Sequence, residues 1–212
     1  MQKSRRVALA TLACGAAALA PFTGVFSPAT ANAGDAVANL QPVALNGVPG
    51  SGTAFVSVHG TRVDVTMRAS GLLADAPHAA HIHFGAQARH ECPNAGDDSD
   101  ASGTLKTSEG GPAYGPVRVS LTKTGDTSPA SALAVDRFDT APGGNLTYQR
   151  GHIKVAQDVA KAITAGQAVI VIHGVDHNHD GAYNGTTPSD LDPALPTEAT
   201  DPALCGRVVP QK

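Results

Sequence analysis

The chain has 212 residues, and its 18 acidic against 15 basic residues give a formal net charge of −3. That balance argues against a nucleic-acid or anionic-membrane partner, because either would require a basic surface. Trp is absent and aromatic residues make up only 4% of the chain, so the core must rest on Val, Ala, Leu and Ile.

The first 33 residues predict a secretory signal peptide. Three cations (Lys3, Arg5 and Arg6) are followed by an apolar run over residues 7–20, and residues 31–33 have the A-x-A spacing of a cleavage site. We expect cleavage after Ala33, secretion, and a single β-domain over residues 34–212, which is long enough to build one hydrophobic core.

The alternative reading of this segment is a transmembrane anchor. The apolar run is short for a bilayer span, and Pro21 and Pro28 interrupt the residues after it. We therefore expect no stable membrane insertion.

Apolar and polar residues alternate in the stretches 54–59 and 62–67, with Gly60-Thr61 between them. Period-two alternation on both sides of a short turn predicts a β-hairpin. Further strands are expected at 117–121, 153–155, 168–173 and 204–209. Residues 156–165 predict one or two helical turns that end before Gly166.

Two long segments, 91–116 and 176–202, are rich in Gly, Pro, Asp and Ser. Structureless loops of this size in a compact domain are usually functional. Many short strands joined by long loops predict an all-β fold, namely a Greek-key β-sandwich or barrel with two long loops and a short helical turn.

Two cysteines, Cys92 and Cys205, remain after the expected cleavage. In an exported chain an isolated pair most simply forms one disulfide bond, and two free thiols are the alternative. On the chain-entropy model a bond that closes so long a loop stabilises the fold by roughly 4–5 kcal/mol.

The nine histidines of the chain are clustered, and this is its main chemical signal. His81 and His83 are two residues apart, so on a strand both imidazoles share one face. His173 ends the apolar run 168–173, which would place a third ring at the rim of the core. Three converging imidazoles suit copper or zinc. The alternative is a set of ordinary surface histidines.

These residues belong to a longer pattern that resembles the copper/zinc superoxide dismutase family from about residue 35 to residue 209. Its motifs, in chain order, are AHIHFG at 80–85, Cys92, VIH at 171–173 and LCGRV at 204–208. The pattern is also similar to the related chordin-type secreted domains, whose signature is a short A-H-I-H run.

The resemblance implies the Greek-key fold of that family and a copper site that also carries catalysis. The copper ligands would be His81, His83 and His173, with His78 behind them. It also implies that Cys92 and Cys205 form the disulfide bond of the family.

The departures from the family pattern concern zinc and superoxide. Asp98 stands where the family has the His that bridges copper and zinc, and the downstream zinc-ligand histidines are missing between residues 99 and 150. Pro202 stands where the family has a guiding Arg. A zinc site of the family type is therefore not expected, and superoxide dismutation would have to proceed without the bridging His and the guiding Arg.

Residues 98–109 fit the spacing of an EF-hand calcium loop, with a Gly at its sixth position. The oxygen ligands would come from Asp98, Asp100, Ser102, the carbonyl of Thr104, and a bidentate Glu109. Hard cations such as calcium take oxygen ligands of these kinds. A plain solvated loop is the alternative.

A second loop repeats the first half of this pattern with Asp176, Asn178 and Asp180. Its twelfth position is not a Glu, so Asp190, Asp192 or water would have to complete a calcium site there. If calcium binds, it would order these two loops as zinc does in the resembled family.

Three further histidines have open assignments. His177 and His179 would either bind a transition metal themselves or simply decorate their loop. His90 could swing in as a fourth copper ligand.

Two functions from different classes are compatible with these features. The first is a secreted copper oxidoreductase similar to superoxide dismutase, in which copper alternates between Cu(II) and Cu(I). The second is a non-catalytic secreted metal-binding or structural module for copper, calcium or both, of the chordin-type kind. The complete three-His set favours the first, and the missing bridging His and guiding Arg favour the second. In either case the expected ligand is a small molecule or a metal ion.

Overall fold

The computed structural model describes residues 35–211, so the signal peptide expected over residues 1–33 lies outside the described part of the chain. Within that part the β-strands are β1 (Asp35–Pro42), β2 (Ser51–His59), β3 (Arg62–Ser70), β4 (Ala80–His83), β5 (Val117–Ser120), β6 (Leu146–Lys154), β7 (Val169–His173) and β8 (Pro202–Pro210). The α-helices are α1 (Thr107–Tyr114), α2 (Gln157–Thr164) and α3 (Thr197–Thr200). Across residues 35–211 no helix is long and apolar enough to span a bilayer.

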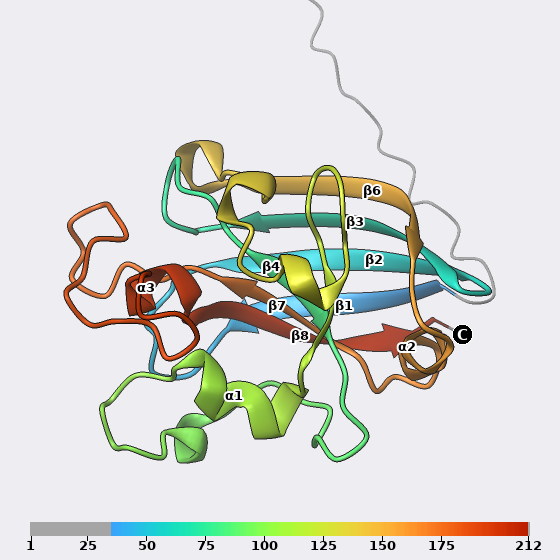
Figure 1. The fold of residues 1–212 in the computed structure, drawn as a ribbon, viewed down its shortest axis with the longest axis horizontal. Coiled ribbons are helices and arrows are strands. Elements are labelled where there is room, and N and C mark those ends of the chain that lie inside the picture. The colour runs from blue at the N-terminus through green and yellow to red at the C-terminus, as the bar shows by residue number, and fades with distance from the viewer. Residues whose placement is uncertain (1–34, 212) are drawn as a thin grey trace, which may run out of the picture. The chain divides into compact units, whose positions relative to one another are not determined.

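The strands form one antiparallel sheet with the order β5-β4-β7-β8-β1-β2-β3-β6. The sheet curls into a half-barrel, with β1, β2, β3 and β6 in one half and β8, β7, β4 and β5 in the other (Figure 1). The short helices lie outside the sheet, in the connections between strands. The expectation of an all-β fold is therefore confirmed at the level of a curled eight-stranded sheet with few short helices.

The predicted hairpin is confirmed, because β2 and β3 pair along their whole length around Gly60-Thr61. Alternation also explains the burial of β3, in which Val63, Val65 and Met67 are buried and their neighbours are not. The predicted helix at 156–165 is confirmed as α2, which ends before Gly166.

Two strands were missed or underestimated for identifiable reasons. β1 buries Ala36, Ala38 and Leu40, but alanine carries little hydrophobic signal. β6 was predicted only near its end, at 153–155. Its pairing with β3 is irregular between Val63 and Val65, and a bulge of this kind breaks the period of two.

The main core lies between the two halves of the sheet. Its cluster joins side chains of β1–β3 to side chains of β4, β7 and β8, including Leu40, Val56, Ile82, Ile170 and Leu204. A core made of Val, Ala, Leu and Ile was expected from the shortage of aromatic residues. Among the described residues the largest fully buried side chains also include Tyr114 and Phe138.

Side chains bridge the open seam between the two edge strands, β5 and β6. Arg150 on β6 donates from Nη1 to the carbonyl and hydroxyl oxygens of Thr122, at 2.7 and 2.9 Å, and from Nη2 to the carbonyl of Gly125 at 2.6 Å. The planar guanidinium can serve several acceptors at once. The hydroxyl of Tyr148, also on β6, donates to the same Thr122 carbonyl at 3.4 Å, so side chains rather than a strand ladder bridge the seam.

The two long segments expected to be structureless are partly helical. The segment 91–116 contains α1, and the segment 176–202 contains α3. Asn46 ties the first of them to the sheet: its side-chain amide donates to the carbonyls of Leu105 and Pro202, at 2.9 and 2.8 Å, and accepts from the Leu105 amide at 2.7 Å. Long-range bonds of this kind are invisible to local sequence patterns.

The expected disulfide bond between Cys92 and Cys205 is present, with a Cα–Cα distance of 5.7 Å. It joins the segment before α1 to β8, across a sequence separation of 113. The alternative of two free thiols is therefore excluded for this structure.

We expect the double substitution Cys92→Ala/Cys205→Ala to lower the free energy of unfolding by about 2–5 kcal/mol, because the bond restricts the unfolded chain over a long loop. Urea unfolding of the variant and of the wild type, monitored by circular dichroism, measures this loss. An unchanged midpoint would show that the bond contributes no net stability.

Candidate metal site

Strands β4 and β7 bring the three sequence-predicted histidines together. The two strands are neighbours in the sheet, and their register places His81 opposite Val171 and His83 opposite Val169. Successive side chains on a strand point to opposite faces. Ile82 and Ile172 enter the main core, so His81, His83 and His173 point to the other face of the sheet.

Covering segments bury that face. A second apolar cluster there includes Val169, Val171 and Tyr114 of α1. The Tyr114 ring centroid lies 4.5 Å from that of His83, and the Phe138 ring centroid lies 5.4 Å from that of His81. The three His residues are only 1–4% exposed. The sequence placed the third ring at the rim of the core, whereas the structure buries all three between the sheet and its cover.

A backbone carbonyl orients each of the three rings. His83 donates from Nδ1 to the carbonyl of Gly115 at 2.8 Å, and His173 donates from Nδ1 to the carbonyl of Thr200 at 2.6 Å. His81 donates from Nε2 to the carbonyl of Ala132 at 3.1 Å. A carbonyl can only accept, so each contact places the ring proton on that nitrogen and leaves the lone pair on the other.

Gly115 is suited to this role by its missing side chain. Its φ of +84° favours glycine, and a Cβ there would lie 2.6 Å from the Gly85 amide nitrogen. A larger residue at 115 would displace the carbonyl that orients His83.

The remaining ring nitrogens are the distinctive feature of the site. Nδ1 of His81, Nε2 of His83 and Nε2 of His173 are buried and have no hydrogen-bond partner among the described residues. One nitrogen from each ring lies within 4.8 Å of the others. Buried polar atoms without partners are rare in native proteins, and three imidazoles grouped this closely could hold a metal ion.

Burial keeps these rings neutral. It lowers the pKa of His83 to about 3, with the nearby His173 adding to the effect, and it lowers the pKa of His173 to about 4 against the opposing bond to Thr200. The pKa of His81 falls well below its usual value because of burial and the two neighbouring rings. Neutral imidazoles are the form that binds metal ions.

His78 lies behind the three rings, as the resemblance implies. It is 1% exposed, and its Nδ1 lies 2.8 Å from the carbonyl of His173. Its Nε2 lies 3.1 Å from the carbonyl of Leu73. His78 therefore holds the backbone at the end of β7 and does not point a nitrogen at the site.

The other histidines do not join the site. Nε2 of His90 lies 2.9 Å from the carbonyl of Gly85, and its ring stacks on Phe84, so the suggestion of a fourth ligand is not supported. His177 pairs with the fully buried Asp201, at 2.9 Å between Nε2 and Oδ2. Among the described residues, His177 and His179 belong to no group of three metal-ligand side chains.

The first acidic loop brings together three of its predicted ligands. Carboxylate oxygens of Asp98, Asp100 and Glu109 lie within 4.8 Å of one another. Glu109 already accepts hydrogen bonds at both oxygens, from the amides of Ser99 and Lys106. These bonds outweigh its burial and lower its pKa.

The other two predicted ligands of this loop lie beside those carboxylates. Ser102 donates its hydroxyl to the carbonyl of Thr104 at 3.2 Å. The ammonium of Lys106 binds Asp100, so this acidic group already holds one cation of the chain itself.

The second loop has the same local hydrogen bonds as the first. Asp176 accepts the amides of Asp180 and Gly181, as Asp98 accepts those of Ser102 and Gly103. Asn178 likewise accepts the Asp180 amide, at 3.0 Å.

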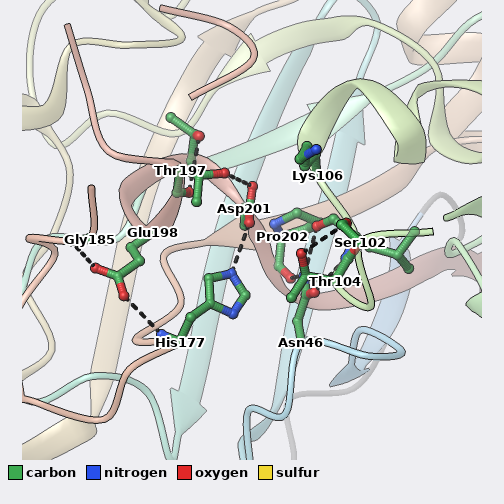
Figure 2. Close-up of polar contacts among 12 residues, drawn as sticks. Asn46, Ser102, Thr104, Lys106, His177, Gly185, Thr197, Glu198, Asp201 and Pro202 are labelled. Carbon is green, nitrogen blue, oxygen red and sulfur yellow. Dashed lines mark hydrogen bonds and ion pairs between the residues drawn. The ribbon is translucent and has the colours of Figure 1, made fainter. Parts of the chain in front are cut away.

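Glu198 of α3 anchors this second loop, and sequence reasoning missed it. It is 2% exposed, and its carboxylate accepts the amides of His177, Asn178, Asn184 and Gly185. Figure 2 shows the contacts with His177 and Gly185. It stands well beyond the twelfth position of the pattern, so no spacing rule could identify it.

Asp190 and Asp192, which were suggested as ligands to complete the second loop, form no metal-ligand group with it among the described residues. Asp190 accepts the amide of Ser108 at the start of α1, and Asp192 accepts the amide of Ala194 within its own segment.

A polar cleft of about 630 Å³ lies beside the two loops. Lys106 lines it from the first loop, and His177 and Glu198 line it from the second loop and α3 (Figure 2). Burial raises the pKa of Asp201 behind the cleft, although its bonds to His177 and Thr197 oppose this. The loops thus stand side by side along this cleft.

No protein-family model and no curated protein matches the chain. Fold and site nevertheless define a class. The chain is a disulfide-bonded, curled antiparallel β-domain with a buried three-histidine group and an acidic group, each of which could hold a metal ion.

We expect the metal-free protein to lose stability as the pH falls from about 6.5 towards 4. The pKa values of the three rings are lower in the folded than in the unfolded state, so the unfolded chain binds more protons in this window. Each ring contributes a slope of up to about 1.4 kcal/mol per pH unit. Urea unfolding at a series of pH values measures this slope.

The matched comparison is His83→Gln against His59→Gln, since the side chain of His59 is 64% exposed. His83→Gln should give a shallower slope than both the wild type and His59→Gln. Equal slopes in all three proteins would contradict the assignment of neutral buried rings.

Proposed function

We propose that this protein is an exported copper-binding protein of the copper/zinc superoxide dismutase type, which keeps the copper ligands and lacks the zinc site. The proposal rests on one observation, the three buried and partnerless ring nitrogens of His81, His83 and His173. A single ion would satisfy all three. Imidazole ligands without carboxylates suit copper rather than calcium or magnesium.

The fold agrees with this proposal. The sheet order places β4 beside β7, β3 beside β6 and β1 beside β8, and such long-range neighbours are typical of Greek-key connections. The Cys92–Cys205 bond and the contact of His78 with the His173 carbonyl match what the resemblance implies. Export rests on the signal-peptide pattern of residues 1–33.

The residues of this chain would bind and orient the ion. The carbonyls of Gly115, Thr200 and Ala132 fix the three rings, and each ring presents its free nitrogen without having to rotate. Backbone contacts of this kind typically set the tautomer and direction of a ligand His. Copper held there would supply one-electron redox chemistry.

Superoxide dismutation is the activity that the resemblance implies, and copper holding without turnover is the second candidate. Two residues at positions where the resembled family has functional residues favour the second candidate, copper binding without turnover. Asp98, at the position of the bridging His, lies in the acidic loop. Pro202, at the position of the guiding Arg, is the uncharged first residue of β8.

We expect the purified protein to bind one copper ion per chain, and His81→Ala to lose it, because two imidazoles cannot replace three in a buried site. Elemental analysis after dialysis and the electron paramagnetic resonance spectrum of Cu(II) measure this. His59→Ala, which removes an exposed histidine, is the control and should keep full binding. Equal copper content in both variants would refute the three-His site.

A superoxide assay on the same proteins separates the two activities. Copper-dependent turnover that is lost in His81→Ala would establish the enzyme, whereas bound copper without turnover would establish the holding protein.

We further propose that the acidic loop at 98–109 binds calcium, because the carboxylates of Asp98, Asp100 and Glu109 converge. Carboxylate and carbonyl oxygens are the ligands that calcium prefers. Binding would require Lys106 to release Asp100. Bound calcium would then fix the position of the segment before α1, and this segment leads into the helix that covers the histidine site.

Calcium at a concentration about 100 times its dissociation constant should stabilise the fold by about 2.7 kcal/mol, since it binds only the folded loop. Thermal unfolding with calcium or with a chelator measures this shift. Asp98→Asn should abolish it, and Asp136→Asn, which removes an exposed carboxylate elsewhere, should preserve it. A melting temperature unchanged by calcium would refute the proposal.

A further inference from the structure

A small apolar hollow lies beside two rings of the three-histidine site. It has a volume of about 30 Å³, and His81 and His173 line its floor. Leu133 and Ala132 line it from the segment after β5, and Leu191 and Leu195 line it from the segment before α3. None of the described residues that line it is charged. The space is about the size of one or two water molecules.

Hydrogen bonds of Ser189 fix the segment that carries Leu191 and Leu195. Ser189 donates its amide to the carbonyl of Leu195 at 2.9 Å, and its hydroxyl lies 2.7 Å from the hydroxyl of Thr200. The same Thr200 supplies the carbonyl that orients His173. The apolar cover and the ligand orientation therefore share one anchor.

The carboxylates near the site are not part of the group of ligand side chains. Asp190 acts on His173 through its charge, but it lies on the exposed side of the segment and accepts the amide of Ser108. Asp201 is fully buried and pairs with His177 and Thr197. Among the described residues, the three-His group contains neither a carboxylate nor a thiolate.

An ion in this site would thus be held by three neutral nitrogens, with apolar side chains on the side of the hollow. The free energy needed to transfer an ion out of water grows with the square of its charge, so it is about four times larger for a divalent ion than for a monovalent one. Attraction to the fixed dipoles of three neutral rings grows only in proportion to the charge. Because none of the ligands is anionic, the balance of these two free energies favours the ion of lower charge.

We propose that the three-His site selects copper in its monovalent state, Cu(I), over Cu(II), and that the apolar hollow formed by Leu133, Leu191 and Leu195 is what sets this preference. The inference rests on the proposed copper site and adds the oxidation state that the site holds. A site of this kind stores or transfers Cu(I) more readily than it cycles between the two states.

The test measures the affinities of the full protein for both oxidation states. Cu(I) affinity is measured by competition with bicinchoninate under anaerobic reducing conditions, and Cu(II) affinity by competition with nitrilotriacetate in air. We expect tighter binding of Cu(I) than of Cu(II) by at least about tenfold. Equal affinities, or tighter binding of Cu(II), would overturn the proposal.

Two substitutions test the role of the hollow. Leu191→Glu and Leu133→Glu each add a carboxylate to its lining, and both side chains are already partly exposed, at 46% and 37%. A nearby negative charge attracts a divalent ion about twice as strongly as a monovalent one. Each variant should move the ratio of Cu(II) to Cu(I) affinity towards Cu(II) by about tenfold.

Phe55→Glu is the matched control. Phe55 is 58% exposed on β2, in the other half of the sheet, and its replacement changes the net charge by the same amount. It should leave the ratio within about twofold of the wild type. A similar shift in all three variants, or no shift in the two hollow variants, would overturn the role of the hollow. Circular dichroism confirms that each variant is folded.

The outcomes separate this inference from the proposed function. If the wild type binds neither oxidation state, both fail. If it binds copper with Cu(II) preferred, and His81→Ala abolishes that binding, the copper site stands and the Cu(I) preference fails.

Discussion

Three backbone carbonyls, those of Ala132, Gly115 and Thr200, hold the buried imidazoles, and the architecture of the site depends on these contacts. Each carbonyl comes from a different covering segment. The segments therefore have to pack in their observed positions before the rings can present their free nitrogens. Misplacement of any one of them would leave a buried ring with two unsatisfied atoms, which is costly in an apolar environment.

The covering segments are themselves secured by contacts over long sequence separations. The Cys92–Cys205 bond and the buried Asn46 hold the segment around α1 against β8. The carboxylate of Glu198 accepts hydrogen bonds from four backbone amides of the second loop. A sheet supplies the rigid platform, and a small number of polar and covalent ties position the loops that complete the site. This division is common where binding residues lie on connections between strands.

Burial gives the site its chemical character. The same cover that removes the rings from water lowers their pKa values and leaves a hollow without charge. Neutral ligands and apolar surroundings favour an ion of low charge. The exposed acidic loop offers carboxylates to a hard cation instead. One domain thus presents two chemically distinct environments, and α1 contributes a residue to each: Glu109 to the acidic group and Tyr114 to the cover of His83.

The sequence by itself determined the all-β class, the hairpin around Gly60-Thr61, the cysteine pair and the identity of the three histidines, because period-two alternation and rare residue types are local signals. Only the tertiary structure decided which face the rings occupy, which nitrogens are free, that His90 lies elsewhere, and that Glu198 rather than Asp190 anchors the second loop. Those facts depend on which distant carbonyls, amides and apolar side chains meet. No local pattern of residues specifies such tertiary contacts, because they arise from the way the sheet curls and the loops fold over it.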